Sequence, residues 1–261
     1  MMGQTTFRRP SFQLKSKEEL SLMRIAGLLA GETLLEVKKA IRPGVTTKEL
    51  SLMAERYIRK NGGVPTFIGY RGYPDALCVS INEQVVHGIP GPRQIEAGDV
   101  VSIDVAATVK GFVGDTATTV IVGDAPSKEA ESLVSVTEGA LFAAIDQMIV
   151  GNRLGDVSSA VEDFVKPSGF GVVRDFVGHG IGRQMHEEPA VPNYGSKGTG
   201  IKLQPGLVLA IEPMITVGGW QVDMLSDGWT VVTRDGSLAA HFEHTVAITE
   251  EGPKILTSVE C

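Results

Sequence analysis

Four acidic side chains stand inside apolar segments of this sequence, and they constrain its structure more than any other feature. They are Asp104 in VSIDVAA, Asp115 in FVGDTAT, Glu212 in LAIEPMI and Glu243 in HFEHTVA. A buried carboxylate is costly unless it is paired or hydrogen-bonded. A single buried acid would most simply be explained by an ion pair with a lysine or arginine. Lys110, however, is the only basic side chain near any of these segments. The set therefore predicts another source of positive charge.

Divalent metal ions are the natural counter-charge, because two of them balance four carboxylates. His179, in FVGHGIGRQMH, is the best candidate for a neutral ligand, since its flanking glycines allow close backbone approach and imidazole binds transition metals. A core histidine without a metal role is the alternative. Oxygen ligands with one histidine favour Mn, Fe, Co or catalytic Zn over a structural zinc site. We therefore expect a site for two divalent ions.

Four helices are predicted from capping signals followed by apolar residues at helical spacing. Ser16 with Glu19 and Thr46 with Glu49 have the spacing of capping boxes, and glycine or proline follows each predicted helix. The predicted helices span residues 16–42, 46–62, 127–150 and 155–165.

The second and fourth of these helices resemble each other when the sequence is shifted by 107 positions. The shift aligns Gly44 with Gly151 and Glu49 with Asp156, although so short a match could arise by chance. Each half then continues into β-rich sequence: VVSIDVAATV and FVGDTATTVIV in the first, and GLVLAIEPMITV, GWTVV and FEHTVAIT in the second. We predict an α+β fold, an antiparallel sheet flanked by helices and built from two αα-ββ halves. No linker-like segment divides them, so residues 16–261 form one predicted domain after an N-terminal tail, residues 1–15.

Composition narrows the function classes. The formal net charge of −7 argues against a DNA-binding protein. The exception is the start of the chain, where Arg8, Arg9, Lys15 and Lys17 either contact ribosomal RNA or form a solvated tail. No apolar run has the length of a secretory signal or membrane span, and the two cysteines form no disulfide framework, so we expect a soluble cytoplasmic protein without a membrane partner.

Several motifs now carry a family resemblance. CVSINEQVVHGIP, SIDVAATVKGFVGDTA, GHGIGRQMHEEP, AIEPM and FEHTVAIT resemble, in order and spacing, the motifs of type I methionine aminopeptidases across most of the chain. The resemblance implies the pita-bread fold of the creatinase and aminopeptidase class. It also implies a monomeric enzyme that removes the initiator methionine of nascent proteins when the second residue is small.

The resemblance also implies roles for the acidic residues. Asp104 would chelate one metal, Asp115 and Glu243 would bridge both, and His179 with Glu212 would complete the ligands of the second. A metal-activated hydroxide would attack the scissile carbonyl, and Glu212 would carry the proton to the leaving amine.

Two further histidines receive catalytic roles from the resemblance. His87 and His186 would hydrogen-bond the scissile amide and stabilise the tetrahedral intermediate. The alternatives are a turn residue for His87, before Gly-Ile-Pro, and an exposed ion-pair partner for His186, before two glutamates. For His241 and His244, which flank Glu243, we expect strand packing or hydrogen bonds behind the ligands.

The family positions that form a methionine pocket are aromatic or sulfur-containing here, which suits a flexible thioether. They are Phe67, Tyr70, Tyr73, Cys78, Met185 and Trp229. Phe67 stands where many bacterial relatives have cysteine, and Met185 where they have phenylalanine, so the pocket rim is expected to differ.

Two other functions fit part of the sequence. An Xaa-Pro peptidase shares the fold and ligands but usually has an additional N-terminal domain, for which the residues before the first predicted helix leave no room. A non-catalytic pita-bread binding module is the alternative from another class, and it conflicts with the complete ligand set.

Overall fold

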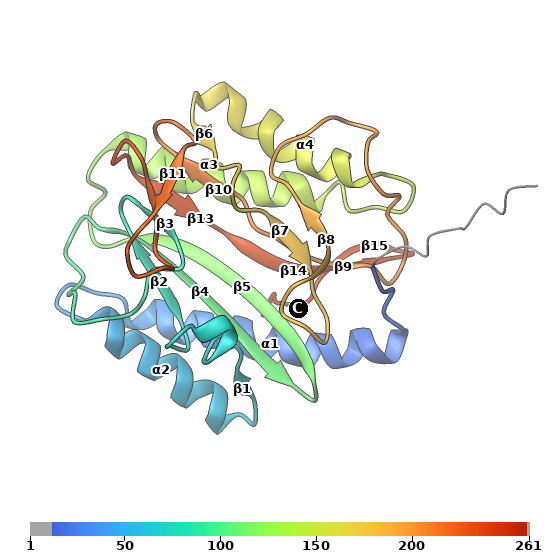
Figure 1. Ribbon diagram of the computed structural model, residues 1–261, viewed down its shortest axis with the longest axis horizontal. Helices are drawn as coiled ribbons and strands as arrows, with labels where there is room; N and C mark the ends of the chain where they lie inside the picture. The colour runs from blue at the N-terminus through green and yellow to red at the C-terminus, as the bar shows by residue number, and fades with distance from the viewer. Residues whose placement is uncertain (1–11, 260–261) are drawn as a thin grey trace, which may run out of the picture.

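Two pairs of helices flank the strands, one pair in each half of the chain (Figure 1). The computed structural model describes residues 12–259. Its helices are α1 (Lys17–Ala40), α2 (Thr47–Lys60), α3 (Lys128–Ile145) and α4 (Leu154–Val165), with short 3-10 turns at η1 (Tyr70–Gly72) and η2 (Lys166–Ser168). The helices lie where the sequence predicts them, apart from the end of α3.

Capping interactions begin the first two helices. The Ser16 hydroxyl accepts a hydrogen bond from the Glu19 backbone N–H at 3.2 Å, and the Glu19 carboxylate accepts one from the Ser16 N–H at 3.0 Å. Thr46 and Glu49 repeat the arrangement at 3.2 and 2.8 Å. Both predicted capping boxes are confirmed, and each satisfies two donors that a helix start leaves free.

The third helix ends at Ile145, so the prediction that it continues to residue 150 is wrong. The Asn152 side-chain amide donates to the Gln147 carbonyl at 3.0 Å, and Gly151 has a φ of 102°. The side chain and the glycine together support a turn that replaces the last helical residues.

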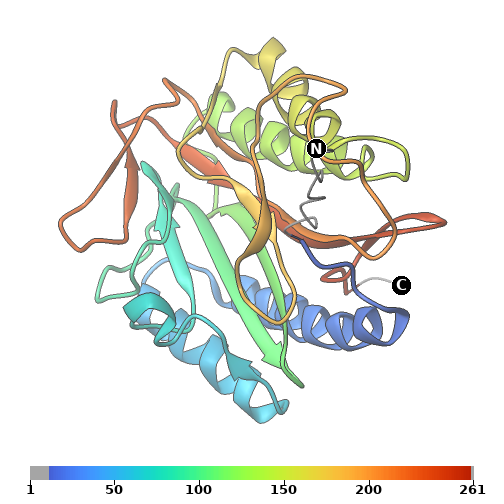
Figure 2. The ribbon, with the colours of Figure 1, turned by 45° about the vertical axis from the view of Figure 1, so that its right-hand side comes forward.

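The main sheet contains nine strands within residues 12–259, and all of its pairings are antiparallel. Its central path is β1-β4-β5-β14-β9-β7-β8, while β2 adds to β4 and β15 to β14. Figures 1 and 2 show the β4–β5 hairpin beside β14, which joins the two halves. The strands are β1 (Val64–Pro65), β2 (Cys78–Ile81), β4 (Val100–Val109), β5 (Phe112–Ile121), β7 (Gly178–Gly180), β8 (Glu187–Val191), β9 (Val208–Ile211), β14 (Glu243–Thr249) and β15 (Gly252–Ile255).

The segment GLVLAIEPMITV, expected as β-rich sequence, forms two strands in different sheets. After β9 the chain breaks at Glu212 and Pro213, and β10 (Met214–Thr216) then pairs with β6 (Gly171–Val172) and β13 (Ala239–His241). Proline has no N–H for a sheet ladder, which accounts for the break. The third sheet is β11 (Val222–Met224), β12 (Val231–Thr233) and β3 (Gln84–Val86).

Repeated backbone hydrogen bonds support the two-half architecture. Ile95 N–H donates to the Val45 carbonyl at 2.9 Å, and Leu203 N–H donates to the Asn152 carbonyl at the same distance. The acceptor Asn152 lies 107 positions after Val45, and the donor Leu203 lies 108 positions after Ile95, so the second bond repeats the first. The same offsets relate two further pairs of bonds: Thr47 to Arg93 with Leu154 to Ile201, and Lys48 to Gly91 with Gly155 to Thr199.

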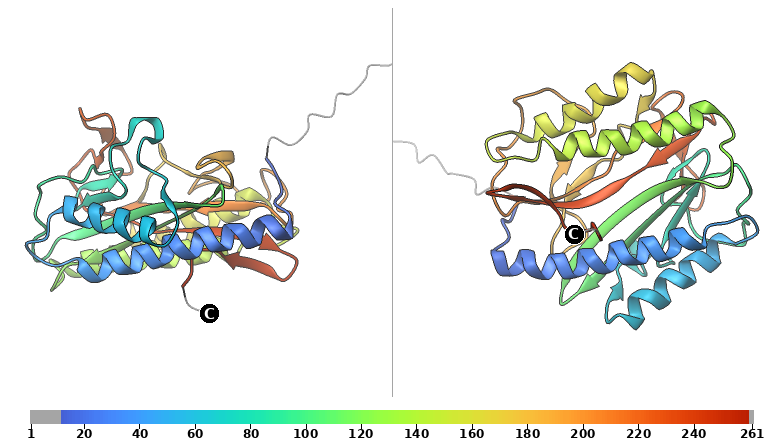
Figure 3. Two further views of the ribbon diagram at one scale, coloured as in Figure 1. Left: turned by 90° about the horizontal axis from the view of Figure 1, so that it is seen from below. Right: turned by 180° about the vertical axis from the view of Figure 1, so that it is seen from behind.

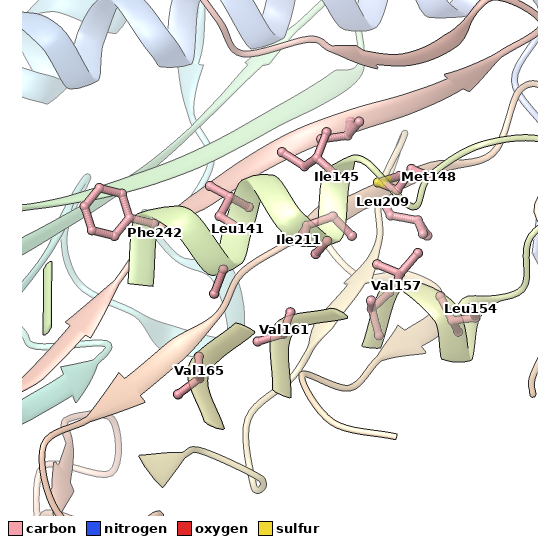
Figure 4. Packing of buried hydrophobic residues seen from close by; sticks show 14 of the residues in the cluster. Leu141, Ile145, Met148, Leu154, Val157, Val161, Val165, Leu209, Ile211 and Phe242 are labelled. Carbon is pink, nitrogen blue, oxygen red and sulfur yellow. The ribbon is translucent and has the colours of Figure 1, made fainter. Parts of the chain in front are cut away.

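The helices cover one face of the sheet and leave the other to loops. Seen from behind, α1 and α3 lie in front of the strands (Figure 3). Figure 4 shows the core of the second half, where Leu141 and Ile145 of α3 and Val161 of α4 pack near Leu209 and Ile211 of β9. The opposite face carries the polar residues described next.

Candidate metal centre and active site

Strand register brings three of the predicted ligands together. Asp104 on β4 and Glu243 on β14 both pair with Ala117 of β5, which lies between them. Asp115 precedes Ala117 by two residues on β5, so its side chain points to the same face. Alanine is small, which leaves room for the three carboxylates above the middle strand.

The other two predicted ligands come from β7 and the end of β9. His179 pairs with Ala210 of β9, two residues before Glu212. Ile211 pairs with His244 of β14, so the next position brings Glu212 beside Glu243. The Nε2 atom of His179 lies 3.5 Å from Glu212 Oε1 and 3.9 Å from Asp115 Oδ2. The break at Pro213 thus falls directly after a predicted ligand.

The carboxylates form a buried group without a basic partner. Asp104 Oδ1, Asp115 Oδ1 and Glu243 Oε1 are buried and have no hydrogen-bond partner. Within residues 12–259 no lysine or arginine forms an ion pair with these residues or with Glu212. Burial raises the pKa of Asp104 to about 7. Burial and repulsion between the carboxylates hold the pKa values of Asp115, Glu212 and Glu243 well above their usual range.

These donors fit divalent cations. Ligand atoms of Asp115, His179 and Glu243 lie within 4.8 Å of one another. His179 Nδ1 lies 2.9 Å from the Gly180 carbonyl, which can only accept, so Nδ1 carries the hydrogen and the Nε2 lone pair faces the carboxylates. Burial lowers the pKa of His179 to about 3, which keeps the ring neutral. The buried Asp/His/Glu cluster is therefore suited to divalent metal binding.

The two predicted catalytic histidines flank this cluster. The His186 ring centre is 4.1 Å from that of His179, and its Nδ1 atom is 2.7 Å from the Tyr70 hydroxyl. His87 follows β3 with a φ of 60° and packs edge-on against Trp229, with ring centres 6.1 Å apart. Burial lowers the pKa of His87 to about 4, and partial burial of the ring together with the nearby Arg71 lowers that of His186. Both rings are therefore neutral near pH 7.

Aromatic and sulfur side chains form the wall beside the carboxylates. Cys78 on β2 pairs with Asp104 and is buried. The Tyr73 ring packs edge-on against Trp229, with centres 5.0 Å apart, and its hydroxyl donates to the Gly88 carbonyl at 3.0 Å. Phe67 and Met185 are also buried in this group.

A single cavity of about 120 Å³ brings every predicted site residue together. Among the described residues, its lining adds one that the sequence reasoning missed, Arg71. His241 lies behind the cavity: its buried Nε2 atom has no hydrogen-bond partner and is 4.0 Å from Glu212 Oε2. His244 points to the helix-covered face, where its Nδ1 atom is 2.8 Å from the Thr257 hydroxyl. The structure thus brings the predicted site together, while the role of each residue stays a prediction.

Known proteins resemble this chain in sequence and in fold. The sequence pattern of metallopeptidase family M24 matches residues 21–250. The chain belongs to this family. The methionine aminopeptidase of Clostridium perfringens is 51% identical to this M24 peptidase over 95% of this chain and 99% of its own. Methionine aminopeptidase 1 of Bacillus subtilis is 48% identical over 94% and 98%, respectively.

Solved structures of the same enzymes resemble the fold of this M24 peptidase. The Thermotoga maritima methionine aminopeptidase matches with a TM-score of 0.92 at 46% identity, covering 94% of this chain and 99% of that one. The Pyrococcus furiosus prolidase matches with a TM-score of 0.77 at 23% identity, covering 95% and 66%. The second similarity concerns the fold alone. The expected pita-bread fold is confirmed.

The remaining expectations concern membrane-spanning helices and the N-terminal segment of the M24 peptidase. No helix within residues 12–259 is long and apolar enough to cross a membrane. Of the tail expected over residues 1–15, residues 1–11 lie outside the described part, and with them Arg8 and Arg9. Lys15 is buried and its ammonium group forms an ion pair with Glu187 at 2.5 Å. The boundary between tail and domain stays a prediction.

Proposed function

We propose that this chain is a metal-dependent aminopeptidase that hydrolyses the bond after an N-terminal methionine when the second residue is small. One observation carries the proposal: buried carboxylates with unpaired oxygens and a wall of aromatic rings and sulfur atoms share one cavity. Relatives about half identical over nearly their whole length are named methionine aminopeptidases, which supports the same activity here.

Two divalent ions would bind among the four carboxylates of the cavity. Asp104 would bind one ion, and His179 and Glu212 would bind the other. Asp115 and Glu243 would contribute ligands to both ions. Two ions match the charge of four carboxylates, and Mn, Fe, Co or Zn suits oxygen ligands with one histidine. When bound, such ions lower the pKa of a water molecule and polarise the scissile carbonyl.

The remaining polar side chains would move protons and hold the substrate. Glu212 would accept the proton of the attacking water and pass it to the leaving amine. Tyr70 would donate to Nδ1 of His186, which leaves Nε2–H free to donate to the substrate carbonyl. His87 would make a second such hydrogen bond. Donors in these positions stabilise the oxyanion of a tetrahedral intermediate.

The apolar wall would select the methionine side chain. An unbranched thioether adapts to aromatic rings and makes favourable sulfur contacts, and Tyr73, Cys78 and Trp229 offer both beside Asp104. Phe67 and Met185 complete the wall, with Tyr70 at its rim. A walled cavity of this size favours a small side chain on the second residue.

We infer that the natural substrates are nascent polypeptides and that the enzyme acts in the cytoplasm. We expect it to act as a monomer. A transient ribosome contact would use Arg8, Arg9 and Lys17 rather than Lys15, because the charge of Lys15 is neutralised by Glu187.

Peptide hydrolysis by the metal-free protein reloaded with Mn, Fe, Co or Zn tests this function. We expect free methionine from Met-Ala-Ser and no product from Met-Leu-Ser or an Xaa-Pro peptide. Cleavage of only the Xaa-Pro peptide would indicate the other peptidase activity of this fold. Bound metal without any cleavage would contradict the proposed enzyme, and absence of bound metal would indicate a non-catalytic module.

A further inference from the structure

Arg71 stands at the mouth of the cavity without a carboxylate partner. It is the only lysine or arginine among the described residues that line the cavity. Its guanidinium carbon lies 5.4 Å from the centre of the Tyr70 ring. Within residues 12–259 no Asp or Glu forms an ion pair with it. The charge is therefore available to a molecule that enters the cavity.

The backbone around Arg71 holds it in an uncommon conformation. Arg71 has a φ of 49°, and Gly69 and Gly72 on either side have φ values of 81° and 89°. A non-glycine residue in the left-handed region is uncommon and often marks a functional constraint. Backbone bonds close the turn, from Gly72 N–H to the Gly69 carbonyl at 3.2 Å and from Tyr73 N–H to the Tyr70 carbonyl at 2.9 Å. This turn keeps Arg71 beside Tyr70 and its hydrogen-bonded partner His186.

The polypeptide substrate must pass this turn on its way out. Under the proposed function, its amino end lies at the buried carboxylates and its scissile bond beside His186. His186 and Arg71 are both exposed, so the chain reaches solvent on their side of the cavity. An extended chain advances about 3.3 Å per residue, which brings the third and fourth residues within reach of a long arginine side chain.

We propose that Arg71 favours substrates that carry a carboxylate side chain at the third or fourth residue. This inference rests on the proposed function and names a preference beyond the methionine and the small second residue. An exposed ion pair contributes about 0.2–1 kcal/mol, so the expected preference over a neutral isostere is about 1.5- to 5-fold in kcat/KM. Arg71 would act as a specificity residue, with no part in bond cleavage.

The test compares peptides that differ only at the third residue: Met-Ala-Asp-Ala-amide, Met-Ala-Asn-Ala-amide and Met-Ala-Lys-Ala-amide. The amidated end removes the terminal carboxylate, which would otherwise pair with Arg71 itself. For the unmodified enzyme we expect kcat/KM to fall in the order Asp, Asn, Lys. The Asp preference should decline when salt rises from about 50 to about 500 mM, because screening weakens exposed ion pairs.

Variants of Arg71 identify the source of the preference. Arg71→Met should bring the Asp to Asn ratio to about 1, Arg71→Glu should invert it, and Arg71→Lys should restore part of it. Arg59→Met is the matched control, because Arg59 is an exposed residue of α2 paired with Glu55, and it should leave the ratio unchanged. An equal rate for Asp and Asn in the unmodified enzyme, or an undiminished ratio in Arg71→Met, would overturn the inference. Failure to cleave any of the three peptides would instead count against the proposed function.

Discussion

At the residue scale, the charged side chains that line the cavity differ in burial: Asp104 and Glu243 each carry a buried carboxylate oxygen, whereas Arg71 is exposed. Asp104 and Glu243 stood out because acidic residues are rare in apolar strands, and both prove to carry buried oxygens without partners. Arg71 gave no such signal, since a charged residue between glycines is ordinary for an exposed turn. Its position beside the cavity depends on the fold of the turn, which local sequence does not reveal.

The metal assignment predicts the behaviour of Asp104→Ala and Glu243→Ala. Each variant should bind less metal and lose measurable turnover, because the remaining carboxylates no longer balance two divalent ions. Metal analysis of the purified variants and methionine release from Met-Ala-Ser check this. Asp163→Ala is the matched control, since Asp163 is an exposed partner of Lys197, and it should keep both properties. Normal metal content with full activity in either ligand variant would contradict the assignment.

The two histidines proposed as catalytic should behave differently from the proposed metal ligands. His87→Ala and His186→Ala should keep their metal but lose roughly 10²-fold or more in kcat, the scale of one lost oxyanion donor. Tyr70→Phe removes the hydroxyl that contacts His186 at 2.7 Å, so it should lower kcat by a smaller factor. Loss of metal from either histidine variant would place that histidine among the ligands.

Met185 should influence the pocket rather than the chemistry. Met185→Phe exchanges one buried apolar side chain for another in the cavity wall. We therefore expect a change in KM for methionyl peptides or in inhibitor affinity, with metal content unchanged. Steady-state kinetics with metal analysis check this, and a variant that loses its metal would show that Met185 supports the ligands.

At the element scale, the sequence predicts the helices well because capping boxes and glycines are local signals. The sequence does not predict the break within GLVLAIEPMITV. LVLAIEPMIT reads as one apolar run, and only pairing with distant segments shows that β9 and β10 belong to different sheets. The sequence also favours an exposed Lys15 before α1, whereas the structure buries this side chain against Glu187. Its partner Glu187 lies far along the chain, so no local pattern indicates the pair.

The pair between Lys15 and Glu187 predicts a stability effect in the turn that carries Met185 and His186. Glu187 also accepts hydrogen bonds from the N–H groups of Arg183 and Gln184. Lys15→Met leaves the partly buried carboxylate of Glu187 without a cation, and breaking a fully buried pair costs about 3–5 kcal/mol, which is the upper bound here. Urea unfolding should therefore show a large loss of stability, together with a lower kcat. The double variant Lys15→Met/Glu187→Gln should regain part of the lost stability. Glutamine keeps a side-chain oxygen that can accept from these N–H groups but carries no charge.

A surface pair provides the control for this experiment. Lys39 and Glu36 form an exposed ion pair on α1 at 2.6 Å, and exposed pairs contribute little. Lys39→Met should therefore unfold at nearly the same urea concentration as the unmodified protein. If Lys15→Met behaved like Lys39→Met, the buried pair would have no role in holding the turn.

At the scale of the whole molecule, the site lies between the two halves. Asp104 and Asp115 come from the first half, and His179, Glu212 and Glu243 come from the second. Asp104 and Glu212 are themselves 108 positions apart, the offset that relates the backbone bonds of the halves. The sequence predicted this symmetry from one short match, but the hydrogen bonds that support it are made by the backbone and leave little trace in residue identity. Metal binding would therefore join the halves and stabilise the folded state.

The raised pKa values predict how the metal-free protein responds to pH. Burial raises the folded-state pKa of Asp104 to about 7 and holds those of Asp115, Glu212 and Glu243 well above their unfolded values. These carboxyl groups thus bind more protons in the folded state than in the unfolded state above about pH 5, and their contribution to stability falls as pH rises through these pKa values. Each extra proton held by the folded state contributes a slope of about 1.4 kcal/mol per pH unit.

The window from about pH 7.5 to about pH 8 separates this effect from the titration of the histidines. All five histidines have lowered pKa values in the folded state, about 3 for His179 and about 4 for His87. Their protonation in the unfolded state opposes the trend near their unfolded pKa of about 6.5, and about one pH unit higher they are nearly neutral in both states. Thermal melts of chelator-treated protein should therefore show a falling midpoint across the window. With metal bound, the carboxylates stay ionised, so the midpoint should be nearly constant. Asp115→Asn removes one titrating group and should make the metal-free slope shallower, whereas a midpoint that rose with pH would contradict the assignment of a carboxylate cluster to the metal site.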